Sequence, residues 1–168
     1  MCDRTYRFLR CSLALGGFAA GAAAPAAAQA TAAPSDVPRF TSPPSLPPAK
    51  GYSHVAAVPA GARLLFLSGQ VALDSAGALV GPGDARAQTR QVFENLRRAL
   101  AVEGATFVDV VKLTFYLRDV ATLPVVREVR DQYVNGAAPP ASTLVEVRRL
   151  FRDDVLLEVD AVAVARPH

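Results

Sequence analysis

Apolar and polar residues alternate along two runs near the end of the chain, and this alternation is the clearest structural signal in the sequence. Residues 139–164 read P-P-A-S-T-L-V-E-V-R-R-L-F-R-D-D-V-L-L-E-V-D-A-V-A-V, two alternating runs joined by a short charged segment. The pattern predicts an antiparallel β-hairpin. Because strand side chains alternate between faces, Ser142 and Leu144 share one face of the first strand, and Glu158 and Asp160 share one face of the second.

Two carboxylates interrupt the otherwise apolar second run. An unpaired buried carboxylate is energetically costly, so acids in such a strand need a functional or structural reason. Asp160 is therefore our first candidate for a catalytic residue. The alternative is a structural acid that pairs with a neighbouring subunit. Glu158 and Glu146 fit a structural or rim role better.

Two other segments show the periodicity of amphipathic helices. The first spans 84–102, and Gly104 is a natural stop after it. Its apolar face carries Thr89, Val92, Phe93, Leu96 and Leu100. The second begins at Thr122, has Pro124 in its first turn, and is expected to end at Asn135-Gly136.

Shorter alternating runs predict three further strands, at 52–58, at 64–67 with an extension to 70, and at 109–117. The resulting order is several strands, helix, strand, helix and two strands. This order predicts an α+β fold with both helices on one face of a mixed β-sheet. The other face would be uncovered and partly apolar, so we expect the domain to bury it by self-association.

The first thirty residues differ in composition from the rest of the 168-residue chain. Arg4, Arg7 and Arg10 precede an Ala-rich apolar run, and Ala28 and Ala30 offer an A-x-A cleavage site, as in a secretory signal peptide. Glycines and a proline make the run too weak for a membrane span. We expect export, to the periplasm, with no membrane attachment after cleavage; a disordered Ala-rich tail is the alternative.

A proline-rich stretch follows at 31–50, which we interpret as an extended linker or arm, so that the folded domain comprises 51–168. Removal of 1–30 lowers the formal net charge from +3 to +1, because that segment holds three Arg and one Asp. The small remaining charge gives no support for nucleic-acid binding.

Both cysteines, Cys2 and Cys11, lie in the predicted signal peptide. The mature protein would then have no disulfide, no thiolate metal site and no cysteine nucleophile. The two histidines, His54 and His168, give no metal-binding or Ser-His-Asp pattern. We therefore expect neither a metal nor a cofactor.

Several motifs in fixed order cover most of 51–168. They are G-Y-S-H at 51–54, L-S-G-Q at 67–70, a Gln followed by Asn-Leu at 88–96, D-V-V-K-L-T-F-Y-L-R-D at 109–119, P-A-S-T-L-V-E-V at 140–147 and E-V-D-A-V-A-V at 158–164. Together they resemble the YjgF/RidA family. No motif is diagnostic by itself, but the set is specific.

The resemblance implies a chorismate-mutase-like α+β fold and a homotrimer with a small-molecule ligand in clefts between subunits. The best-known members hydrolyse reactive 2-imino acids, or their enamine tautomers, to 2-keto acids and ammonia without a cofactor. In them an arginine binds the substrate carboxylate, and an acidic residue on the last strand positions or activates water.

Carried over by position, the resemblance implies that Tyr52 lies at the cleft edge and that Ser68 and Gly69 approach the ligand through their backbone. Asp160 matches the acidic residue, usually Glu in the family, and Ser142 stands where the family has its arginine.

Leu144 stands where many members have cysteine. Arg127, in the second helix, falls where the family often has a polar residue near the cleft, so we consider it a displaced cation. For Arg127 the alternative is a solvated helix-face residue, for Tyr52 ordinary packing, and for Ser68-Gly69 a turn that needs small residues.

Two hypotheses follow from these residues. The first is a variant imine or enamine deaminase with an altered substrate pocket, in which Asp160 acts as general base on a water near Ser142. The second is a non-catalytic trimeric module that binds a small ligand in the intersubunit cleft or interacts with other proteins.

Overall fold

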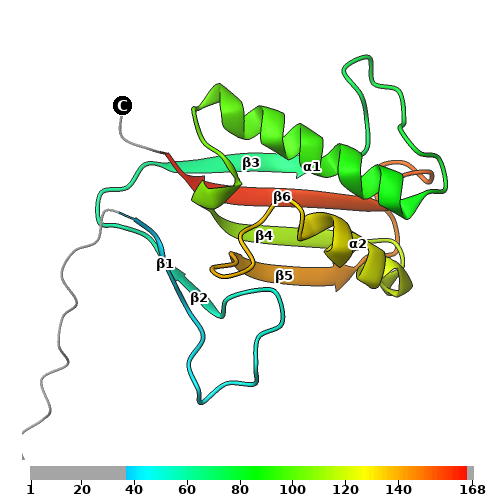
Figure 1. Ribbon diagram of the computed structural model, residues 1–168. Helices are drawn as coiled ribbons and strands as arrows, with labels where there is room; N and C mark the ends of the chain where they lie inside the picture. Colours follow the sequence, from blue (N-terminus) through cyan, green and yellow to red (C-terminus); the bar gives the residue numbers. More distant parts are fainter. Residues whose placement is uncertain (1–36, 166–168) are drawn as a thin grey trace, which may run out of the picture. The chain divides into compact units, whose positions relative to one another are not determined.

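The computed structural model describes residues 37–165. The predicted signal peptide, 1–30, and the start of the predicted linker lie outside the described residues. The elements are, in order, β1 (Arg39–Thr41), β2 (Val55–Ala57), β3 (Leu64–Gln70), α1 (Ala85–Val102), a 3₁₀ turn (Phe107–Asp109), β4 (Val110–Leu117), a second 3₁₀ turn (Val120–Thr122), α2 (Leu123–Arg130), β5 (Ala141–Glu146) and β6 (Leu157–Val164), as shown in Figure 1.

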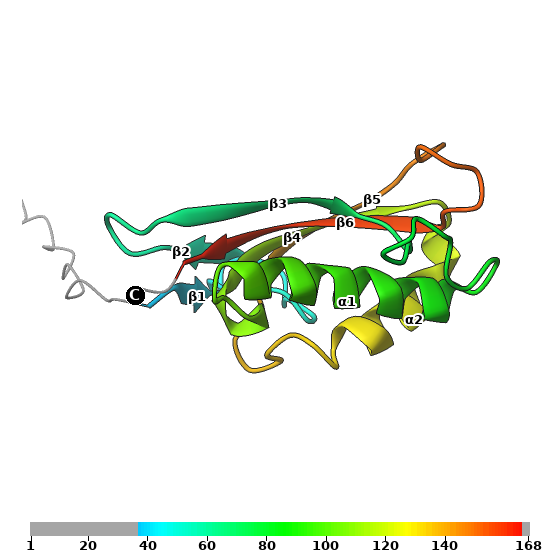
Figure 2. The ribbon, with the colours of Figure 1, turned by 90° about the horizontal axis from the view of Figure 1, so that it is seen from above.

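Four strands form the main sheet, in the order β3-β6-β4-β5. β6 is antiparallel to both of its neighbours, whereas β5 runs parallel to β4. Both helices lie on the same side of this sheet (Figure 2). The prediction of an α+β fold with a mixed sheet and two helices on one face is thus confirmed.

The predicted hairpin at 139–164 is wrong in its pairing, because β4 lies between β5 and β6. The helix α2 carries the chain from the end of β4 back to its start, so β5 must run parallel to β4. The segment 147–156 then passes the end of β4, where Val147 N–H donates to Leu117 O at 2.8 Å and Arg118 N–H donates to Leu156 O at 2.9 Å. Alternation within each strand is the same for either pairing, so it could not reveal the intervening strand.

The helix α1 begins where the sequence predicts. The Asp84 side chain caps it by accepting from the backbone N–H of Arg86 at 2.8 Å and of Ala87 at 3.0 Å, and Gly104 follows its end with a φ of +67°. The helix α2 ends at Arg130, earlier than predicted, and the chain continues in tight turns; Tyr133 N–H donates to Arg130 O at 2.9 Å.

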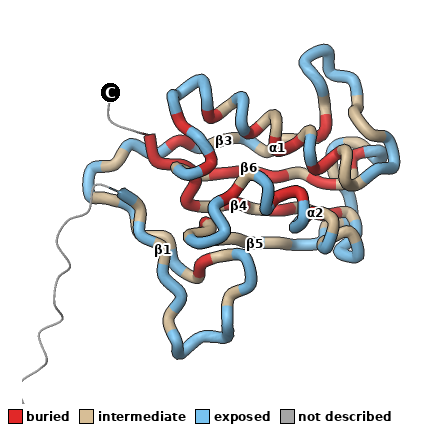
Figure 3. Tube along the Cα trace, in the orientation of Figure 1, coloured by how far each residue is buried: buried red, intermediate tan, exposed pale blue. Residues whose placement is uncertain are grey.

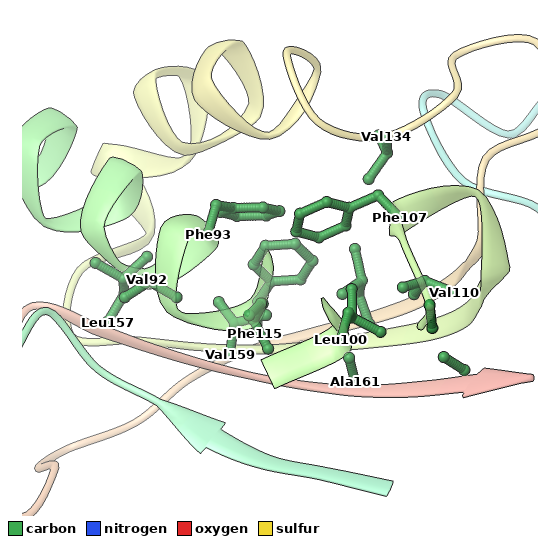
Figure 4. Close-up of a cluster of buried hydrophobic side chains, with 14 of the residues drawn as sticks. Val92, Phe93, Leu100, Phe107, Val110, Phe115, Val134, Leu157, Val159 and Ala161 are labelled. Carbon is green, nitrogen blue, oxygen red and sulfur yellow. The ribbon is translucent and has the colours of Figure 1, made fainter. Parts of the chain in front are cut away.

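Aromatic rings fill the space between the helices and the sheet (Figure 4). The Phe93 ring from α1 lies 5.6 Å from that of Phe107 and 5.1 Å from that of Tyr133. Below them, β6 contributes its buried alternate residues Leu157 and Val159. Each fully buried side chain of this size contributes about 1.5–3 kcal/mol, so this cluster is the principal stabilising element of the domain.

The opposite face of the sheet has no helix on it. Phe66 on β3 is 78% exposed there, and Val145 on β5 is 40% exposed. Figure 3 shows the buried residues concentrated along β4 and β6, with exposed and intermediate residues on β1. We call the face of the main sheet that carries no helix the open face.

The segment before Gly51 is not simply a linker, since it contains β1. β1 pairs antiparallel with β2, with Phe40 opposite Ala56. Just before β2, Ser53 pairs with the start of β5 in the main sheet, and its N–H donates to Pro140 O at 3.1 Å. Ordered backbone pairing therefore begins upstream of Gly51. Within 37–165, neither helix is both long enough and apolar enough to cross a membrane.

Candidate functional site

A cavity of about 140 Å³ lies between α2 and the β4–β5 edge of the sheet. It is lined by Lys50, Tyr52, Phe115, Leu123, Val126, Arg127, Arg130, Ser142 and Leu144. Four of the residues predicted for the site, Tyr52, Arg127, Ser142 and Leu144, are therefore neighbours in the structure. We call these four the cavity group.

Local geometry explains why these side chains meet. On β5, Ser142 and Leu144 lie opposite Leu113 and Phe115 of β4, which are buried under the helices. The helix α2 presents residues at i, i+3, i+4 and i+7 to the same space, because these positions share one helix face. The floor of the cavity is apolar, and its remaining wall carries positive charge.

Arg130 is the most enclosed of the basic residues, at 7% exposure. Its Nε and Nη2 both donate to Asp131 Oδ1, at 2.8 and 2.6 Å. Its guanidinium also packs against Gly51, where a Cβ atom would collide with Nη2. An arginine has five N–H donors, so three remain for a ligand or water within the described part of the chain. Arg130 is thus held in place with donor capacity left over.

Asp160 does not lie in this cavity. It is paired with Thr114 of β4, while Ser142 is paired with the adjacent Leu113, so the two side chains lie on opposite faces of the sheet. Asp160 is half-buried on the open face, where Oδ2 accepts a 3.1 Å hydrogen bond from the Tyr116 hydroxyl. This hydrogen bond and the carboxylate charge raise the pKa of Tyr116.

Ser68 and Gly69 lie on β3, at the edge of the sheet opposite β5. The pairing of β3 with β6 shifts between Leu67 and Gln70, and a Cβ at Gly69 would collide with the Glu158 side chain, which would have to move. Glu158 shares the open face with Asp160. Ser68, Gly69 and Asp160 therefore form a second set of predicted site residues, which we call the open-face group.

One chain consequently presents the predicted residues as two separate groups. The cavity group lies on the helix side at the β5 edge, and the open-face group lies on the other side, toward β3. Because the sheet lies between them, the two groups do not meet within one chain. We refer to them as the two half-sites.

The sequence reasoning missed the two other basic residues of the cavity, Lys50 and Arg130. Arg130 had a detectable signal, because it stands seven residues after Leu123 on the stripe of α2 that faces the sheet, where apolar residues are expected. A charged residue on such a stripe indicates a cavity or a buried partner. Lys50 had no signal, since it lies in the segment that looked like linker.

The Tyr52 ring packs against the His54 ring in an edge-on arrangement, with ring centroids 5.3 Å apart.

Within 37–165, no three His, Cys, Asp or Glu side chains are grouped so as to hold a metal ion. The arrangement can bind a small anion over an apolar floor through guanidinium, ammonium and hydroxyl donors. The open face can supply a carboxylate.

The family model described as Endoribonuclease L-PSP matches residues 43–165, which is most of the chain. The chain belongs to this family, the YjgF/RidA family. The resemblance inferred from the motifs is thereby confirmed, and the matched residues include every residue of the two half-sites.

Similar proteins span the same domain. Protein DfrA of Myxococcus xanthus is 42% identical over 114 residues, covering 68% of this chain and 85% of that protein. The 2-iminobutanoate/2-iminopropanoate deaminase of Mus musculus is 33% identical over 105 residues, covering 62% of this chain and 76% of that protein. Among solved structures, the Rid family protein YyfB of Yersinia pestis, described as of unknown function, has a TM-score of 0.70 at 34% identity, covering 76% of this chain and 98% of that one.

Proposed function

We propose that this YjgF/RidA family member is a cofactor-independent deaminase that hydrolyses reactive imines or enamines to a carbonyl compound and ammonia. The observation that carries the proposal is the cavity beside Ser142, which gathers Tyr52 and Arg127 with two further cations. The deaminase activity in the name of the Mus musculus relative supports it. The changed residues on β5 imply an altered substrate pocket.

The chemistry needs few protein groups. A water oxygen attacks the imine carbon and forms a C–O bond, while Asp160 accepts a proton from that water as general base. That proton passes to the nitrogen and gives a carbinolamine. A second proton then moves from the new hydroxyl to the amino group, the C–N bond breaks as the C=O bond forms, and ammonia leaves. The carbonyl product remains with the substrate carboxylate still bound by cations of the cavity.

We propose that the working form is a homotrimer in which the open-face group of one subunit completes the cavity group of the next. This arrangement explains why Asp160 and Ser142 lie on opposite faces of one chain. It also covers the exposed side chain of Phe66, which costs free energy in water.

A non-catalytic ligand-binding module is the second candidate. Ser142 favours this candidate, because it stands where the family has its arginine, and β5 therefore lacks the strongest partner for a substrate carboxylate. Such a protein would bind keto acids in the cavity but release no ammonia.

Two of the four arginines on α1 are paired with carboxylates, which weighs against RNA as the ligand of this helix. A nucleic-acid site needs a continuous patch of unpaired basic side chains. Here Arg86 and Arg97 on α1 are paired with Glu128 and Glu94, at 2.6 and 2.8 Å.

We also propose that the protein is exported to the periplasm, on the basis of its N-terminal arginine and alanine pattern. A fusion of residues 1–50 to a reporter active only after export tests this. Cell-associated activity equal to that of a leaderless fusion would contradict it.

The direct test of function is ammonia release. An amino-acid oxidase generates 2-imino acids in the presence of purified 31–168, and ammonia formation is timed against buffer. We expect at least about a tenfold acceleration, since a positioned general base alone contributes about a hundredfold or more. No acceleration with any 2-imino acid, together with keto-acid binding by calorimetry, would favour the ligand-binding module.

A further inference from the structure

The charge of the cavity is larger than one substrate carboxylate requires. Three basic side chains, Lys50, Arg127 and Arg130, line it, and none of its lining residues within 37–165 is acidic. Asp131 is bound to Arg130 and offsets one of these charges. The local balance is therefore two positive charges.

The three cations differ in exposure, which separates them into two positions. Arg130 is enclosed, and its guanidinium is fixed by Asp131 and by the backbone at Gly51. Arg127 and Lys50 are exposed at the rim, one from α2 and the other from the segment before β2. An anion at Arg130 would be partly desolvated, whereas an anion at the rim would stay in contact with water.

The same cavity also has an apolar floor. Phe115 and Leu144 from the sheet and Val126 from α2 form it. A ligand that spans the cavity would thus place a short hydrocarbon segment over the floor and an anionic group at each end. Ser142, which has a hydroxyl rather than a cation, leaves the sheet side of the cavity uncharged.

We propose that the cavity takes a substrate with two anionic groups, a 2-imino dicarboxylic acid, with one carboxylate on Arg130 and the other on Arg127 and Lys50. This inference rests on the proposed deaminase function and specifies its substrate class. The reaction that supplies such a substrate is the oxidation of the amino group of an acidic amino acid. The family's arginine on β5 is absent here, and Arg127 and Arg130 of α2, with Lys50 from the segment before β2, supply positive charge in its place.

Binding of stable keto acids tests the proposal without requiring catalysis. 2-Oxoglutarate and 2-oxopentanoate have the same chain length and differ by the second carboxylate. Calorimetry with each therefore measures how much the second carboxylate adds to the binding affinity. We expect 2-oxoglutarate to bind at least about tenfold more tightly, since charge-assisted hydrogen bonds contribute that much or more. Equal affinities, tighter binding of 2-oxopentanoate, or binding of neither would overturn the proposal.

Variants locate the two positions. Lys50→Gln combined with Arg127→Gln should weaken 2-oxoglutarate binding about tenfold more than 2-oxopentanoate binding and so remove the preference for 2-oxoglutarate. Arg130→Gln should weaken both ligands about tenfold or more. Arg90→Gln, an exposed arginine on α1 outside the cavity, is the matched control and should change neither. An undiminished preference in the double variant would overturn the assignment.

The two proposals fail in different ways. Ammonia release from 2-iminopentanoate as fast as from 2-iminoglutarate, with equal keto-acid affinities, would refute the dicarboxylate preference and leave the deaminase function standing. A clear binding preference without ammonia release from either imine would refute the deaminase function and leave the ligand class standing.

Discussion

The hydroxyl of Tyr116 on β4 donates a 3.1 Å hydrogen bond to Oδ2 of Asp160 on β6, on the face of the sheet that carries no helix. The bond joins neighbouring strands, so it fixes the position of the carboxylate relative to the sheet. The other carboxylate oxygen remains available to a water. Tyr116 is therefore a positioning residue for the proposed base.

Tyr116→Phe should lower kcat about ten- to hundredfold with a smaller change in KM, because a misplaced catalytic group loses efficiency steeply. Steady-state ammonia release measures both constants. Tyr133→Phe is the control, since its hydroxyl donates to Glu94 at 3.0 Å on the helix side, away from both half-sites. An equal fall in kcat for the two variants would show that the effect is not specific to Asp160.

Alkaline pH should destabilise the protein through Tyr116. Its raised pKa, caused by the hydrogen bond to Asp160 and that carboxylate's charge, means that the folded state holds the proton more tightly than the unfolded state. The stabilisation is complete below the ordinary tyrosine pKa of about 10 and is lost as the pH rises through the higher folded value. Melting temperatures from about pH 8 to about pH 12 should fall less steeply in Tyr116→Phe; parallel curves would contradict this.

Gly51→Ala should destabilise the domain by about 2–3 kcal/mol. Gly51 has a φ of +75°, and its new Cβ would also collide with Arg130. Gly77→Ala is the matched control, because Gly77 has a φ of +80° but nothing within 4 Å of its Cβ position. It should cost only about 1 kcal/mol. Urea unfolding gives both changes in the free energy of unfolding. Equal decreases for the two variants would mean that the Arg130 side chain moves aside without an energetic cost.

Gln88→Leu should cost about 2–4 kcal/mol, because it removes three hydrogen bonds between a buried side chain and the backbone. Gln88 Nε2 donates to Gly81 O at 3.2 Å and to Asp154 O at 2.9 Å, and its Oε1 accepts from Leu156 N–H at 2.8 Å. The control Gln132→Leu removes only an exposed contact of 3.4 Å and should stay within about 0.5 kcal/mol. A small loss for Gln88→Leu would show that water replaces these bonds.

Local patterns in the sequence predicted the elements well and their partners poorly. The helix α1 and its cap at Asp84 follow from periodicity and capping chemistry, which act within a few residues. The position of β4 between β5 and β6 depends on the path of α2, to which alternation within a strand is insensitive. The apparent hairpin was therefore two strands with a third between them.

The candidate site shows the same division. Periodicity and the family motifs identified Tyr52, Arg127, Ser142 and Leu144, which the structure brings together. Arg130 was missed because its role depends on how α2 lies over the sheet and on the approach of Gly51. The opposite orientation of Ser142 and Asp160 depends on strand register, which no single run of residues encodes.

The central claim is that one catalytic site combines the cavity group of one subunit with the open-face group of another. Co-expression of Arg130→Gln and Asp160→Asn chains with different tags, followed by purification of mixed oligomers, tests it most directly. Each variant alone should be nearly inactive in ammonia release. A mixed trimer of either composition has both intact halves at one of its three sites, so activity should recover to about one third of that of the unmodified protein. Mixed oligomers as inactive as the separate variants would contradict the account.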